Sequence, residues 1–93
     1  MLEHIPTKED ILAAHKRISP YIHLTPVFTS HWFDERVGKP CVFKGEHLQK
    51  TGAFKARGAM NAVLVNADIA RGKGFITHSS GNHGAALAWA AAQ

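Results

Sequence analysis

A strand, a glycine-containing loop and a helix follow one another twice in this chain, and this order constrains the fold more than any other feature. Residues 41–43 form a short apolar run before a polar loop, and helical spacing of apolar residues runs from 54 to about 67. Residues 75–77 are then predicted to form a strand, 79–84 a turn and 85–93 a small-residue helix. This alternation predicts an α/β fold with a parallel sheet, whose ligands bind beyond the carboxyl ends of the strands.

The first forty residues carry recognisable helix starts and stops. Thr7 opens the run TKED, a capping-box pattern, and apolar residues follow at helical spacing until Pro20. Residues 23–28 contain a proline and are predicted to be an extended or edge segment. Ser30 is a predicted cap of a short helix that stops at Gly38. Trp32, Phe43 and Trp89 are predicted core residues.

Length, charge and cysteine content exclude several classes of protein. With 93 residues, 45% apolar and 19% charged, the chain has the composition of one small globular domain. The net charge of +4 comes from scattered basic residues without interleaved aromatics, so nucleic acid is not an expected partner. The first eighteen residues mix both charges, so we expect neither a signal peptide nor a membrane span. A single cysteine, Cys41, permits no internal disulfide and fits a cytoplasmic protein.

Lys55 lies in the run QKTGAFKARGA, at the predicted start of a helix and between Gly52 and Gly58. The helix dipole is positive at that end and disfavours a cation, so the position favours a neutral amine that is held out of water. Such an amine is what a Schiff-base lysine requires. The second run, HSSGNHG at 78–84, combines hydroxyls, glycines and a helix start, which suit a substrate carboxylate.

Each of these residues also has an ordinary structural interpretation. A lone helix lysine is usually a solvated surface residue, and serine and asparagine in turns usually cap backbone groups. The seven histidines are dispersed, so a metal site is not predicted. A nucleophile elbow needs G-x-S-x-G, whereas Ser79 follows Thr77 and His78, so a serine hydrolase is not predicted either.

Together, KGEHLQKTGAFKARGAMNAV and THSSGNHGAALAWAA resemble the fold-type II pyridoxal-phosphate enzymes. Within that group the chain is most similar to the serine/threonine dehydratase (threonine ammonia-lyase) and serine racemase family. The resemblance implies the three-layer, parallel-sheet fold of the tryptophan synthase β-like superfamily, of which these residues would be the N-terminal portion. It also implies pyridoxal 5'-phosphate as cofactor, a small amino-acid substrate and a homo-oligomeric full-length protein.

The resemblance assigns roles to matching positions. Lys55 would bind the cofactor aldehyde and take the Cα proton, with Phe54 packed near the ring. Asn82 would donate a hydrogen bond to the ring hydroxyl oxygen. The Ser80 hydroxyl would face Cα opposite the lysine, where it can supply or accept a proton. The loop that grips the substrate carboxylate would consist of Ser79, Ser80, Gly81, Asn82 and His83.

The implied reaction is removal of water from L-threonine or L-serine, which leaves a 2-oxo acid and ammonia after hydrolysis. Serine racemisation is the alternative, because serine at position 80 keeps it possible and many dehydratases carry alanine there. The resemblance does not separate threonine, serine and hydroxyaspartate as substrates.

This sequence departs from the family pattern in two ways. Ala53 stands where serine is common, which puts cofactor affinity in question. The family's phosphate-binding glycine cup and its pyridine-nitrogen partner come after the SSGNHG turn, so the 93 residues alone are expected to be inactive. A non-catalytic truncated chain that only docks to partner chains is therefore an alternative of another class. Residues 1–72 would belong to the large domain and 73–93 to the small one, with a polar hinge at 68–74.

Overall fold

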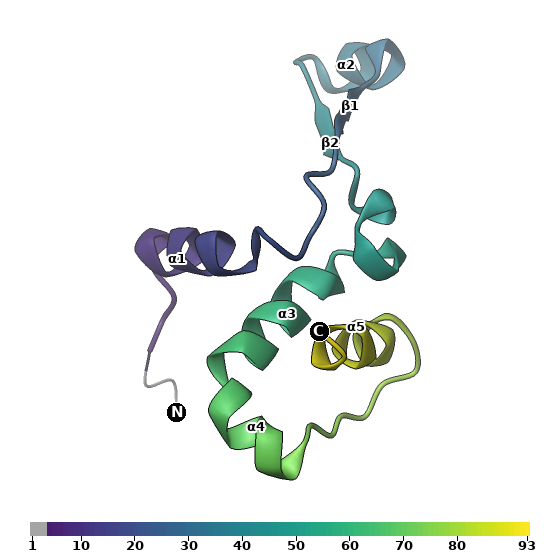
Figure 1. Cartoon of the computed structure of the whole chain (residues 1–93). Helices are drawn as coiled ribbons and strands as arrows, with labels where there is room; N and C mark the ends of the chain where they lie inside the picture. The colour runs from purple at the N-terminus through teal and green to yellow at the C-terminus, as the bar shows by residue number, and fades with distance from the viewer. Residues whose placement is uncertain (1–3) are drawn as a thin grey trace.

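A computed structural model describes residues 4–93, which form an elongated molecule with extents of 54 × 28 × 27 Å. Two helices, α3 and α5, lie against each other at one end, and a small sheet with α2 projects from the other (Figure 1). The elements in chain order are α1 (Lys8–Ile18), β1 (Val27–Thr29), α2 (His31–Val37), β2 (Val42–Lys44), the 3-10 turns η1 (Glu46–Leu48) and η2 (Lys50–Gly52), α3 (Lys55–Val65), α4 (Ala67–Lys73) and α5 (Asn82–Ala91).

The helix boundaries predicted in the first forty residues are confirmed. The Thr7 hydroxyl accepts a bond from the Asp10 backbone N–H, and the Asp10 carboxylate accepts one from the Thr7 N–H, which completes a capping box. The Ser30 hydroxyl caps α2 by accepting from the Phe33 N–H at 3.4 Å. That helix ends at Gly38 in the left-handed conformation.

The described sheet is antiparallel. β1 pairs with β2 in the register Val27–Lys44, Phe28–Phe43 and Thr29–Val42. The extended character of 23–28 is confirmed, and the strand predicted at 41–43 lies one residue later. The prediction of a strand at 75–77 is wrong. That segment is extended, but it pairs with no strand among residues 4–93. No parallel pairing forms within these residues, since a strand needs a neighbour to bond to.

The polar hinge predicted at 68–74 is instead α4. The run ADIARGK contains good helix formers, and the Ala70 N–H donates to the Asn66 carbonyl at 3.0 Å in the first turn. Gly72 lies inside this helix, whereas Gly74 ends it with φ 75° and ψ −171°. The domain boundary between 72 and 73 would fall in the last turn of α4, and it stays a prediction.

The core is small and lies between α1, α3 and α5. Its buried members are Ile18, Ala59, Met60, Ala86 and Ala90. The alanines allow the backbones of α3 and α5 to approach closely around Met60, the largest fully buried side chain in the described part of the chain. The apolar face of α5 therefore packs the second motif run onto the helix that begins at Lys55.

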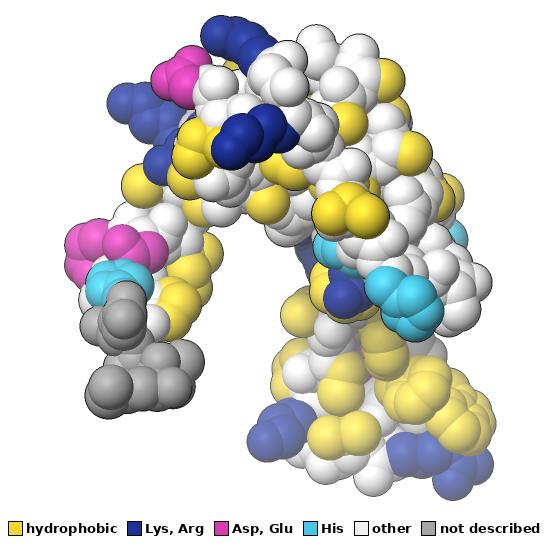
Figure 2. All heavy atoms as spheres, turned by 90° about the horizontal axis from the view of Figure 1, so that it is seen from below, with side chains coloured by type: hydrophobic (Ala, Val, Ile, Leu, Met, Phe, Trp, Pro, Cys, Tyr) yellow, Lys and Arg dark blue, Asp and Glu magenta, His cyan; other side chains and the backbone are white. Residues whose placement is uncertain are grey.

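The aromatic core prediction is only partly right. Trp89 is half-buried against the core, but Trp32 is 56% exposed and Phe43 is 41% exposed. Both belong to the unit of α2, β1 and β2, which lies away from α3 and α5, so neither reaches the core (Figure 1). Figure 2 shows hydrophobic side chains gathered over this unit with lysine and arginine at its edges.

Candidate functional site

Lys55 is the first residue of α3, where the sequence predicted it. Thr51 and Gly52, both inside η2, have positive φ, 61° and 77°, so the chain turns there before it enters the helix. The Lys55 Nζ lies 5.5 Å from the centre of the Phe54 ring. Both side chains are exposed, so the prediction that Lys55 is held out of water is wrong for the described residues.

One pocket joins the two motif runs. It has a volume of about 360 Å³ and is lined by Phe54, Lys55, Arg57, Gly58, Ala59 and His83. Phe54 directly precedes α3, and the next four residues come from the start of that helix. His83 comes from the first turn of α5, 28 positions after Lys55 in the chain. The packing of α5 against α3 and η2 brings them together. An amine, an aromatic ring and an imidazole thus share one apolar-walled pocket.

The other predicted site residues, at 79–82, directly precede His83 in sequence but do not line this pocket. α5 begins at Asn82, and Gly81 precedes it as a cap without a side-chain hydrogen bond. The Ser79 hydroxyl accepts a bond from the Gly81 N–H at 3.2 Å, which fixes the turn. Ser79, Ser80, Gly81 and Asn82 are all exposed. They present hydroxyls and backbone N–H groups at the positive end of a helix, which suits an anion.

An ion pair that the sequence did not predict anchors the start of α3. The Arg57 Nε donates to Glu46 Oε1, and its Nη2 donates to Oε2 at 3.0 Å. The buried Thr25 hydroxyl also donates to Glu46 Oε2, at 2.6 Å. Hydrogen bonds from Arg57 lower the pKa of Glu46 from 4.5 to about 2, against the opposing effect of burial. The same pairing raises the pKa of Arg57.

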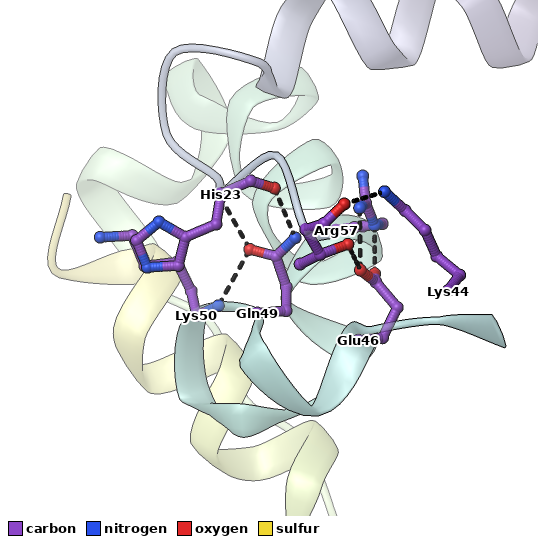
Figure 3. Close-up of polar contacts among 7 residues, drawn as sticks. His23, Lys44, Glu46, Gln49, Lys50 and Arg57 are labelled. Atoms are coloured by element: carbon purple, nitrogen blue, oxygen red, sulfur yellow. Dashed lines mark hydrogen bonds and ion pairs between the residues drawn. The ribbon is translucent and has the colours of Figure 1, made fainter. Parts of the chain in front are cut away.

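Gln49, only 4% exposed, ties the same region together through its amide. Its Oε1 accepts bonds from the backbone N–H groups of His23 and Lys50, each at 2.9 Å, and its Nε2 donates to the His23 carbonyl at 2.9 Å. Figure 3 shows these bonds beside the Glu46–Arg57 pair. The signal in the sequence was weak, because EHLQ and KAR are ordinary polar runs until the fold places them side by side.

A second, larger cavity of about 430 Å³ lies between α3, α4 and α5. Tyr21, Val63, Leu64 and Phe75 are among its lining residues, and none of the predicted site residues is. In the part of the chain from 4 to 93, no group of three or more His, Cys, Asp or Glu side chains is placed to hold a metal ion. No helix in that same part is both long and apolar enough to cross a bilayer.

The chain superposes on solved structures of the fold predicted from its motifs. Maize serine racemase matches it with a TM-score of 0.85 and 49% identity, over 95% of this chain and 28% of that one. The fold is therefore that of the fold-type II pyridoxal-phosphate enzymes. The profile of the family described as "Pyridoxal-phosphate dependent enzyme" matches residues 18–93, and the chain belongs to that family.

Curated relatives agree with this assignment. The β-hydroxyaspartate dehydratase of Paracoccus denitrificans is 52% identical over 95% of this chain and 28% of its own length. Serine racemase of Dictyostelium discoideum is 55% identical over 90% of this chain and 26% of its own length. The chain therefore spans about a quarter of the length of these relatives, in their N-terminal part.

The residues at the Lys55 pocket fit the family's cofactor. Pyridoxal phosphate presents an aldehyde on a flat aromatic ring, and this pocket offers an accessible amine at its edge beside the Phe54 ring. Gly58 and Ala59 contribute small, apolar groups to the pocket wall. Lys55 would hold the aldehyde and Phe54 would lie against the ring. The resemblance assigns the bond to the ring hydroxyl to Asn82, which does not line the pocket but begins α5 next to His83.

Proposed function

We propose that the natural protein carrying these residues is a pyridoxal-phosphate-dependent lyase that removes water from a β-hydroxy amino acid, L-threonine or L-serine. The products would be a 2-oxo acid and ammonia. The observation that supports this most is the pocket shared by Lys55 and His83, because it joins the motif with the amine to the motif that suits a carboxylate. Relatives named as a hydroxyaspartate dehydratase and as a serine racemase support a β-hydroxy amino acid as the substrate class.

In this proposal each side chain does one task. Lys55 would hold the cofactor until the amine of the substrate displaces it, and its freed amine would then take the proton from Cα. The turn from Ser79 to His83 binds the substrate carboxylate at the positive end of α5, which orients Cα toward the amine. The cofactor, when bound, absorbs the electron pair left at Cα. The Cβ–O bond then breaks, and the hydroxyl leaves as water with the proton that Lys55 took from Cα. After release, a water molecule hydrolyses the C–N bond at Cα, which gives the 2-oxo acid and ammonia.

Serine racemase is a second candidate. Ser80 supplies a hydroxyl within the turn that would grip the carboxylate, and a proton donor opposite Lys55 would return a proton to the other face of Cα. Two observations favour this candidate: the 55% identity with serine racemase of Dictyostelium discoideum and the TM-score of 0.85 with maize serine racemase. The cytoplasmic location and the homo-oligomeric assembly stay predictions.

A single substitution tests the proposal in the full-length natural protein. Lys55→Ala should abolish the visible absorbance band that a lysine-bound cofactor gives, and it should abolish turnover of L-serine and L-threonine. Lys39→Ala is the matched control. This lysine is exposed and lies outside both motif runs, so its removal should leave the absorbance band and turnover unchanged. Retention of the band and of turnover in Lys55→Ala would remove the proposal.

The product formed by the unaltered protein separates the two candidates. A 2-oxo acid from L-serine, measured by its reduction with a coupled dehydrogenase, supports the lyase. D-serine, measured by chiral chromatography, supports the racemase. Formation of neither product from L-serine or L-threonine would contradict both.

A further inference from the structure

The residues that fix the start of α3 form a clamp made of Thr25, Lys44, Glu46 and Arg57. Figure 3 labels the last three of these. Arg57 holds the Glu46 carboxylate through two donors, and Thr25 holds the same carboxylate through its hydroxyl. The Lys44 Nζ donates to the Thr25 carbonyl at 2.6 Å. Two segments that are distant in sequence, around Thr25 and at 44–46, are therefore tied to the first turn of α3.

This clamp acts at a helix start that has no side-chain cap. Phe54 precedes α3 and makes no side-chain capping bond. Helical residues turn by about 100° each, so Arg57 lies about 200° around the axis from Lys55. The two residues therefore leave the helix axis in different directions, although both line the pocket. Fixing Arg57 therefore fixes the rotation of the turn and with it the direction of Lys55.

Burial makes the clamp rigid. The Glu46 side chain is 19% exposed and Arg57 is 27% exposed, whereas the exposed Arg71–Asp68 pair on α4 has side chains 80% and 99% exposed. The Glu46–Arg57 pair also has two parallel donors, while Arg71 and Asp68 share one contact at 3.5 Å. A partly buried, two-donor pair defines a geometry, and a solvated single contact does not.

We propose that Arg57 and Glu46 are positioning residues that aim the Lys55 amine into the pocket it shares with His83. The inference rests on the proposed function of Lys55. Arg57 lines the same pocket, and its guanidinium is held by Glu46. Arg57 acts through the helix turn, and Glu46 acts through Arg57.

The test compares three variants of the full-length natural protein. Arg57→Met keeps the length of the side chain and removes its charge, Arg57→Lys restores the charge without the two-donor fork, and Arg71→Met removes the exposed pair as a matched control. The cofactor-free protein is treated briefly with pyridoxal phosphate and borohydride. Peptide mass spectrometry then gives the labelling of Lys55 relative to that of the exposed Lys39.

We expect Arg57→Met to lower the Lys55/Lys39 labelling ratio by about tenfold or more and to lower kcat by about 100-fold, since a shift of ~1 Å in a reacting group has that effect. KM should stay within about threefold, because substrate contacts are intact. Arg57→Lys should recover part of both losses, and Arg71→Met should match the unaltered protein. An unchanged labelling ratio and kcat in Arg57→Met would overturn the inference.

Two further results keep the inference separate from its neighbours. If Arg57→Met fails to fold, Glu46→Gln, which keeps an acceptor for Arg57 but removes the charge, takes its place. A lower Lys55/Lys39 labelling ratio in Glu46→Gln supports the inference, and an unchanged ratio overturns it. If Lys55→Ala keeps the cofactor absorbance band, the proposed function fails, and this inference fails with it. If Lys55→Ala loses the band while Arg57→Met labels normally, only the positioning role is overturned.

Discussion

Glu46 links the geometry near Lys55 to pH. The charged groups around its carboxylate are Arg57, which bonds to it directly, and Lys44, which adds a weaker attraction. Together with the Thr25 hydroxyl they lower the pKa of Glu46 from 4.5 to about 2. A carboxyl whose pKa is depressed on folding stabilises the native state fully above its unfolded value. That contribution is lost as the pH falls from about 4.5 through about 2.

We predict that Glu46→Gln makes the natural protein less sensitive to acid. Between pH 5 and pH 2 the free energy of unfolding should fall by about 2 kcal/mol more in the unaltered protein than in the variant, allowing for partial screening at this half-buried site. Urea titrations at each pH measure the difference. Asp68→Asn, at the exposed pair, is the control and should follow the unaltered protein. Identical pH profiles for Glu46→Gln and the unaltered protein would show that the pair contributes nothing.

At the scale of elements, the junction after α4 depends on one backbone conformation. Gly74 ends the helix with φ 75° and ψ −171°, a region that side chains other than glycine avoid. Gly72, two residues earlier, has ordinary helical geometry and open space around its Cα. The extended segment from 75 to the SSGNHG turn starts at this point, so Gly74 sets its direction.

We predict opposite effects for alanine at these two glycines. Gly74→Ala should destabilise the natural protein by about 1–3 kcal/mol, because alanine is strained at that φ and ψ. Gly72→Ala should stabilise it by about 0.5–1 kcal/mol, because alanine is the better helix former. Thermal unfolding of both variants gives the comparison. Equal effects of the two substitutions would contradict the assigned helix end.

The elements that the sequence predicted correctly are those that depend on local chemistry. The Thr7 capping box, the Ser30 cap and the stop at Gly38 each involve residues within a few positions of one another. Position 55 at a helix start follows from spacing in the same way, and a helix does follow the second turn. That helix begins at Asn82, however, three residues before the predicted start at 85 and inside the second motif. By contrast, the Glu46–Arg57 pair and the pocket joining Lys55 to His83 depend on how segments pack, which spacing does not encode. The hinge predicted at 68–74 was wrong because its two glycines and polar residues were given more weight than the good helix formers in the same run.

At the scale of the whole molecule, these residues bury little and expose much. Apart from Ile18 and Met60, the buried hydrophobic residues in the described part of the chain are alanines. Around α2 and the sheet, Trp32 and Phe33 stack edge to face at 4.9 Å, and Phe33 meets Phe43 at 5.0 Å, with all three at least 41% exposed. Exposed aromatic groups of this kind are normally covered by further protein. The alternative of a non-catalytic chain that docks to partners predicts the same surface.

We predict that a polypeptide of these 93 residues, produced alone, unfolds without a sharp transition and binds a hydrophobic dye such as ANS at neutral pH. A core this thin offers little cooperative stabilisation, and the aromatic cluster of Trp32, Phe33 and Phe43 offers the dye a surface. Calorimetry and dye fluorescence test the two statements. Trp32→Gln should reduce dye binding and leave the melting profile unchanged, because this side chain lies outside the core. A single cooperative transition without dye binding would show that these residues form a self-sufficient domain, and it would count against the docking alternative.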